Sequence, residues 1–141
     1  MSIDKKTTEV IQEFAQLDSW EAKYKKLIEF GKKLGPIDAR FKLDKFLVKG
    51  CQSQVWLAPE MREKSLHFFA DSDALIVKGI VSLLVYVYSG EAPEDILNDK
   101  GDFLSEIGIT NHLSMNRSNG LSSMMKSIKL YATVFQALNQ K

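Results

Sequence analysis

The chain has 141 residues, of which 45% are hydrophobic and 26% charged, an ordinary composition for one soluble domain. Its formal net charge of +1 supplies no basic field for nucleic acid or for an anionic membrane surface. The single cysteine, Cys51, excludes an internal disulfide, and no apolar run is long enough to span a bilayer. Because the first residues also lack the apolar core of a signal peptide, we expect a cytoplasmic protein.

The N-terminal part of the chain is predicted to be helical. Apolar residues at helical spacing indicate a first helix with Thr7 or Thr8 as its N-cap. A second helix begins at Asp18-Ser19 and ends at Gly35-Pro36, because proline cannot continue the helical hydrogen-bond ladder. No segment of roughly 20–50 residues repeats and no linker-like stretch interrupts the chain, so we expect one domain, 1–141.

The middle of the chain changes to β-prone sequence. Three short runs, at residues 46–48, 55–57 and 65–69, are rich in the β-branched and aromatic residues that favour strands. The polar residues between them are typical of connections. This pattern predicts an antiparallel sheet of three strands.

The second half is predicted to be helical again. Asp71-Ser72-Asp73 offers N-cap oxygens to a helix over 74–88, which is apolar on nearly every side and therefore belongs in the core. Gly90 ends it, and a short helix opens at 92–95. The last helix runs from near Gly120 to near residue 139. The sum is an α+β fold with helices packed on a small three-stranded sheet.

Cys51 is the candidate reactive residue because of its position. It follows Gly50 between the first two predicted strands, and Gln52, Ser53 and Gln54 complete the loop. Glycine adopts backbone conformations closed to other residues, and a loop tip presents a sulfur atom to a partner more readily than a strand does. The competing interpretation is a buried and inert residue, since free cysteines are among the most buried side chains.

Two chemistries fit a single loop cysteine. A stand-alone thiol enzyme needs a base, and His112, which lies among polar residues, is the better of the two histidines. Sulfur transfer needs only a thiolate that attacks the outer sulfur of another protein's persulfide. Arg117 either supplies positive charge near the thiol or pairs with a carboxylate such as Asp71 or Asp73. A metal site is not expected, because one cysteine and two scattered histidines lack the spacing of ligands.

Four segments, in order along the chain, resemble the SufE family of sulfur acceptors. Residues 50–56, which read Gly-Cys-Gln-Ser-Gln-Val-Trp, are similar to its signature loop. Residues 20–24 are similar to its early tryptophan–tyrosine helix, and 71–79 to the segment that leads into its central helix. Residues 112–121 are similar to the start of its last helix, although Met115-Asn116 stands where the family often has a proline.

The resemblance implies a fold shared with the IscU scaffold and a role in iron–sulfur cluster assembly. Proteins of this family accept persulfide sulfur from a pyridoxal-phosphate cysteine desulfurase, SufS or CsdA, and stimulate its turnover. They pass the sulfur toward an iron–sulfur scaffold of the SufBCD type. The cofactor belongs to the partner, so we expect none here, and we expect an activator of an enzyme rather than an enzyme.

The resemblance also suggests roles for individual residues. Cys51 matches the acceptor cysteine, and Gly50 with 52–54 forms the supporting loop. His112, Arg117 and Asp73 are candidates for the thiol environment or the docking surface. Two alternatives stay open from the sequence: a thiol enzyme that uses Cys51 with His112 as base, and a structural adaptor in which Cys51 only packs.

Overall fold

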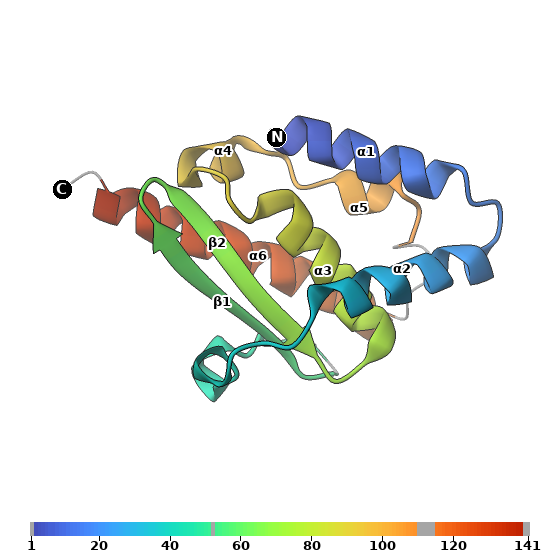
Figure 1. Ribbon diagram of the computed structural model, residues 1–141, viewed down its shortest axis with the longest axis horizontal. Coiled ribbons are helices and arrows are strands. Elements are labelled where there is room, and N and C mark those ends of the chain that lie inside the picture. Colours follow the sequence, from blue (N-terminus) through green and yellow to red (C-terminus); the bar gives the residue numbers. More distant parts are fainter. Residues whose placement is uncertain (1, 52, 110–114, 140–141) are drawn as a thin grey trace.

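The computed structural model describes residues 2–51, 53–109 and 115–139. It has the predicted α+β architecture, with helices gathered around a long β-hairpin (Figure 1). The elements in chain order are α1 (Ile3–Ala15), α2 (Trp20–Leu34), the 3₁₀ turns η1 (Ala39–Phe41) and η2 (Asp44–Phe46), β1 (Val55–Arg62), β2 (Ser65–Ser72), α3 (Leu75–Tyr88), α4 (Pro93–Asn98), α5 (Phe103–Glu106) and α6 (Met115–Asn139).

The sheet has two strands among the described residues, so the predicted third strand at 46–48 is wrong. Strands β1 and β2 pair antiparallel, from Val55 opposite Ser72 to the hairpin end. Leu47 forms only an isolated bridge with Trp56. The reason is local: the backbone N–H groups of Phe46 and Leu47 donate to carbonyls three residues back, which winds this stretch into 3₁₀ turns.

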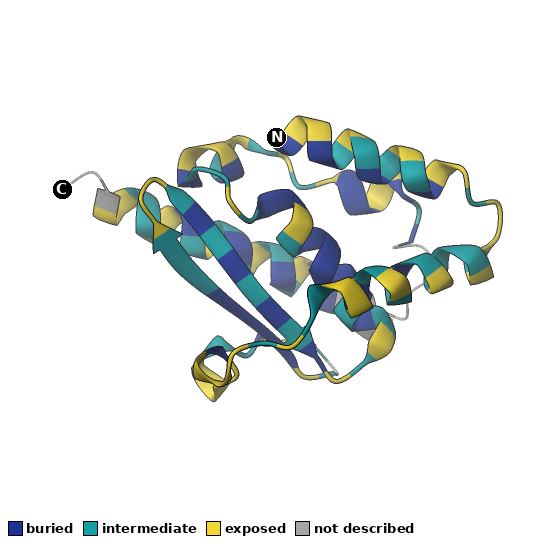
Figure 2. Cartoon of the chain, in the orientation of Figure 1, coloured by how far each residue is buried: buried dark blue, intermediate teal, exposed yellow. Residues whose placement is uncertain are grey.

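The core forms where α3 and α6 pack against the inner face of the hairpin. Strand β2 alternates between half-buried and buried residues, the period-two pattern of a strand with one covered face (Figure 2). Helix α3 is buried over most of its length, as its apolar sequence predicts, and Tyr131 of α6 donates a hydrogen bond to the Leu57 carbonyl of β1 at 3.2 Å. No helix in the described ranges is long and apolar enough to cross a membrane.

Three helix starts differ from the predictions. Helix α1 begins a turn earlier, because Ser2 rather than Thr7 or Thr8 accepts a hydrogen bond from a first-turn N–H, that of Lys5. Helix α3 has Ala74 at its N-cap position without a side-chain cap, because β2 extends through Ser72. Helix α6 begins at Met115, which places Gly120 inside the helix.

Other helix boundaries follow the sequence closely. Ser19 caps α2 by accepting from the Ala22 N–H at 3.1 Å, and Gly35, with φ 73°, ends the helix. Gly90, with φ 88°, follows α3, and Pro93 opens α4. The short helix α5 and the two 3₁₀ turns were not predicted from the sequence.

Candidate functional site: the Cys51 loop on helix α6

The loop that carries Cys51 is closed at its neck by the backbone. The Val48 N–H donates to the Val55 carbonyl at 2.8 Å, next to the bridge between Leu47 and Trp56. Gly50 has φ 89°, a left-handed conformation that favours glycine and lets the chain turn sharply before the cysteine. The bond between Val48 and Val55 therefore fixes the start of the loop beside the start of β1, and Cys51 lies three residues after Val48.

Cys51 lies against α6 rather than free in solvent. Its thiol donates a weak hydrogen bond to the carbonyl of Gly120, with Sγ 3.8 Å from the oxygen, and the side chain is half-buried. One turn along the helix, Ser123 lies below Gly50, so close that a Cβ at residue 50 would lie 2.8 Å from the Ser123 Oγ. Small residues on both surfaces thus allow the loop to touch the helix.

This environment weakens the thiol as a nucleophile in the resting state. Partial burial raises the pKa of Cys51, because the thiolate loses hydration that the neutral thiol does not need. The thiolate is the reactive form, so the resting residue is protonated near neutral pH. A reaction at Cys51 is favoured when the sulfur leaves this position.

The far end of the loop is attached to the end of β2. The Gln54 N–H donates to the Asp73 carboxylate at 3.0 Å, and the Ser72 hydroxyl donates to the Gln54 carbonyl at 2.8 Å. The Asp73 N–H also donates to the Gln54 carbonyl, at 3.3 Å. The described contacts of Asp73 are thus with the loop's exit, which places this residue beside the Cys51 loop but not on the sulfur.

The other predicted site residues are only partly described. Gln52 and His112 lie outside the described residues, as does the side chain of Arg117, whose backbone belongs to α6. Ser53 is half-buried. Asp71, one carboxylate considered for Arg117, pairs with two described lysines, Lys42 at 3.4 Å and Lys78 at 3.2 Å.

Sequence reasoning did not identify Gly120 and Ser123 as partners of the loop. They lie three residues apart, on one face of α6, and the pair of small residues is the only local signal for a close approach. The contact itself joins Cys51 to a residue 69 positions away. Such a separation gives no periodic pattern in the sequence.

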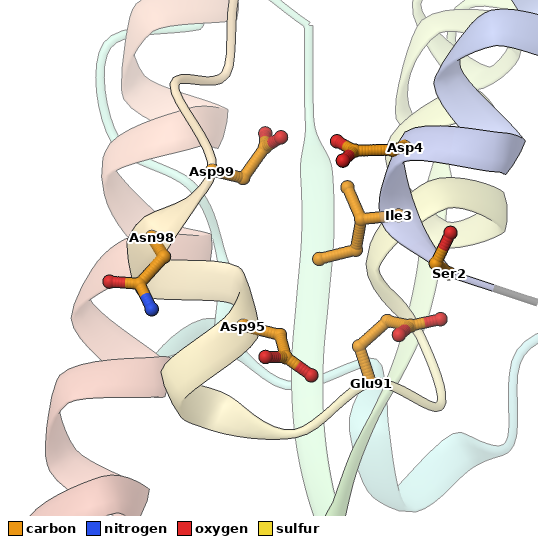
Figure 3. A pocket seen from close by; sticks show the side chains of 7 residues that line it. All are labelled: Ser2, Ile3, Asp4, Glu91, Asp95, Asn98 and Asp99. Carbon is orange, nitrogen blue, oxygen red and sulfur yellow. The ribbon is translucent and has the colours of Figure 1, made fainter.

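A separate acidic cavity of about 290 Å³ lies between the start of α1 and α4 (Figure 3). Glu91 on the wall of this cavity forms an isolated β-bridge with Leu66, near the hairpin turn. The Cys51 loop is bonded to Ser72 at the other end of β2, roughly 20 Å away, so the cavity is separate from the loop. Lys6 pairs with Glu91 at 2.7 Å. The residues that line the cavity are Ser2, Ile3, Asp4, Glu91, Asp95, Asn98 and Asp99.

In the described part of the chain, no three His, Cys, Asp or Glu side chains are placed to hold a metal ion.

Comparison with known proteins identifies the family. The family model of SufE, described as an Fe-S metabolism associated domain, matches residues 8–132. The chain belongs to the SufE family. A SufE-like protein of Rhizobium meliloti strain 1021, itself uncharacterized, is 38% identical over 126 residues, which cover 86% of this chain and 90% of the relative.

A solved structure supports the fold of this SufE-family chain independently. The solution structure of a hypothetical protein from Thermus thermophilus matches with a TM-score of 0.77 and 21% sequence identity. The match covers 95% of this chain and 96% of the other. This match confirms the fold; the family model and the SufE-like relative confirm the sequence resemblance, and the family ties the chain to iron–sulfur metabolism.

Proposed function

We propose that this protein is a sulfur acceptor, in which Cys51 takes persulfide sulfur from a cysteine desulfurase of the SufS or CsdA type. The observation that carries the proposal is a free thiol at the tip of a glycine-bearing loop, half-buried and within reach of solvent, in a member of the SufE family. Gly50 and residues 52–54 form the segment that presents the thiol.

The proposed chemistry is a thiol–persulfide exchange. The Cys51 thiolate attacks the outer sulfur of the donor persulfide, and a bond forms between Sγ and that sulfur. The sulfur–sulfur bond of the donor breaks, and the donor cysteine leaves as a thiolate with the bonding electron pair. Cys51 then carries the persulfide, with no net oxidation, and no metal or second cysteine is needed.

Activation of Cys51 is coupled to its release from α6. Burial raises the pKa of the resting thiol, so contact with the donor must favour the thiolate. Movement of the loop away from the Gly120 carbonyl exposes Sγ to water and to the donor at the same time. The partner thus meets a thiol that becomes reactive on docking. Transfer of the outer sulfur frees the donor cysteine for another turnover, which is the proposed basis for stimulation of the desulfurase.

The proposed recipient of the sulfur is an iron–sulfur scaffold of the SufBCD type, in the cytoplasm, where a single free cysteine stays reduced. In this scheme pyridoxal phosphate acts in the desulfurase, and the SufE-family chain carries sulfur without a cofactor of its own. Its role is that of an activator and carrier, and Cys51 returns to the free thiol after each transfer.

The test is intact mass after the protein is mixed with a SufS-type desulfurase and free cysteine, without reductant. The proposal predicts a gain of one sulfur atom that disappears in Cys51→Ser and on addition of a reductant. The matched control is Ser122→Ala, an exposed change on α6 that leaves the loop and its thiol in place. A Cys51 that stays unmodified with every desulfurase tried, although iodoacetamide alkylates it, would contradict the proposal.

A further inference from the structure

We propose that Gly120 of α6 is a positioning residue that holds Cys51 in its low-reactivity state. Because Gly120 has no side chain, the Sγ atom of Cys51 can pack directly against the backbone of α6 at this position. The inference concerns the regulation of the same thiol, and it rests on the proposed function for its biological meaning.

The geometry at Gly120 leaves little space for a side chain. A Cβ on residue 120 would lie 3.1 Å from Cys51 Sγ and 3.7 Å from both Cα and Cβ of the cysteine. The first distance is shorter than an ordinary carbon–sulfur contact, so one partner would have to move. Helix α6 is held by Tyr131 on β1 and by Lys129 on the carbonyls of Ile96 in α4 and of Asp99 just after it, so we expect the loop to be the partner that moves.

The contact also favours the neutral thiol. The Gly120 carbonyl accepts the S–H of Cys51, and its oxygen carries partial negative charge that opposes a thiolate at the same position. Since Gly120 is buried, the backbone of α6 shields one side of the sulfur from solvent. A cysteine held here is both less ionised and less accessible than one on a free loop.

A glycine inside a helix is a poor helix former, and alanine would be the better residue for α6 on its own. The close approach of Cys51 is the described feature that a side chain at this position would disturb. Gly50 and Ser123 repeat the arrangement one turn further along, where a Cβ on Gly50 would lie 2.8 Å from the serine hydroxyl oxygen. Two close approaches of this kind seat the loop on the helix.

The experiment measures the alkylation rate of Cys51 by iodoacetamide in Gly120→Ala. We expect a rise of about threefold or more at pH 7.5, because a sulfur displaced from the Gly120 carbonyl is both more accessible and more ionised. Ser122→Ala, an exposed change on the same helix, is the matched control and should react at the wild-type rate.

Low concentrations of urea separate a local effect from general destabilisation. If the alanine frees the loop locally, the faster rate is nearly independent of urea well below the unfolding transition. A rate that rises with urea at the slope of global unfolding would mean that the variant reacts only when unfolded, and would overturn the proposal. An unchanged or slower rate in the folded variant would overturn it as well.

If Gly120→Ala does not fold, Ser123→Leu is the second variant. A leucine at residue 123 would displace the loop at Gly50 from the next turn of α6. Its alkylation rate is judged by the same criteria. No desulfurase is present in these assays. A failure of Gly120→Ala to change the alkylation rate is therefore distinguishable from a failure of Cys51 to accept sulfur.

Discussion

The hydrogen bond between Gln54 and Asp73 predicts how strongly the loop exit restrains Cys51. Three described hydrogen bonds join Gln54 to Ser72 and Asp73, and the substitution Asp73→Ala removes the one made by the carboxylate, at 3.0 Å. The two bonds that remain involve the Asp73 backbone and the Ser72 hydroxyl, so the loop should loosen without detaching. The effect should appear at Cys51, three residues from Gln54.

The expected magnitude follows from the strength of that bond. A single hydrogen bond contributes about 1 kcal/mol net, and this typical value applies rather than the larger one for charged acceptors, because Asp73 is exposed and solvated. A loss of about 1 kcal/mol raises the population of the open loop about fivefold. Since alkylation of a half-buried thiol proceeds through locally open conformations, the iodoacetamide rate of Cys51 should rise by the same factor.

The control for this prediction is Asp73→Asn, which keeps a side-chain oxygen as acceptor and removes only the charge. It should react within about twofold of the wild-type rate, because most of the bond survives. Both variants should keep the wild-type unfolding temperature to within a few degrees, since Asp73 is exposed. Equal rates for wild type, alanine and asparagine variants would refute the reasoning that the exit bond limits loop opening.

Two further predictions concern packing and pH. Gly79→Ala should lower the free energy of unfolding by about 2 kcal/mol, because its Cβ would overlap the Leu27 carbonyl oxygen where α2 crosses α3. An unchanged urea midpoint would contradict this, and Ser122→Ala should leave the midpoint in place. The alkylation rate of Cys51 should rise with pH to a midpoint above the ordinary thiol pKa of about 8.5, since burial raises the pKa in the folded state. Because the folded protein binds that proton more tightly than the unfolded chain, stability should decline as pH rises through about 8.5, and Cys51→Ser should reduce that decline, as thermal unfolding at several pH values can measure.

Local rules predicted the elements whose ends depend on one residue type. Ser19 and Gly35 define α2 because each satisfies a backbone requirement within a few residues of itself. The alternation of half-buried and buried residues in β2, and the apolar sequence of the buried helix α3, are likewise visible in the local hydrophobic pattern. These signals depend on nearby sequence, which is why they could be read from it.

The errors occurred where a distant or competing contact decided the outcome. Residues 46–48 have strand composition, yet the 3₁₀ turn at η2 uses their N–H groups locally and leaves one bridge, Leu47 to Trp56. The side-chain N-cap expected from Asp71-Ser72-Asp73 did not form: Ala74 takes the N-cap position, and the Asp73 carboxylate accepts from Gln54. In both cases the residue type suits the predicted role, but a competing hydrogen bond at or near the Cys51 loop gives the residue a different role.

The candidate site also has one part that the sequence predicts and one part that it does not. The sequence identifies Cys51 by its glycine neighbour and its family motif, but the surface under the thiol belongs to α6, 69 positions further along. Glu91 on the wall of the cavity near α4 pairs with Lys6 of α1, a contact that joins α1 to the turn before α4. The volume of a cavity is therefore a poor guide to the candidate site in this fold.

The fixed ends of the loop limit how far the sulfur can travel. The chain is held at Val48 by the bond to Val55 and at Gln54 by the bonds to Ser72 and Asp73, so Cys51 lies three residues from either anchor. An extended chain of three residues spans about 10 Å, so Cys51 stays within about 10 Å of Val48 and of Gln54 while both anchors are intact. If Cys51 accepts sulfur as proposed, a donor whose persulfide lies deeper than that in its own structure must bring the sulfur out toward the loop. A donor cysteine on a protruding or mobile segment would then fit this surface better than one in a buried active site.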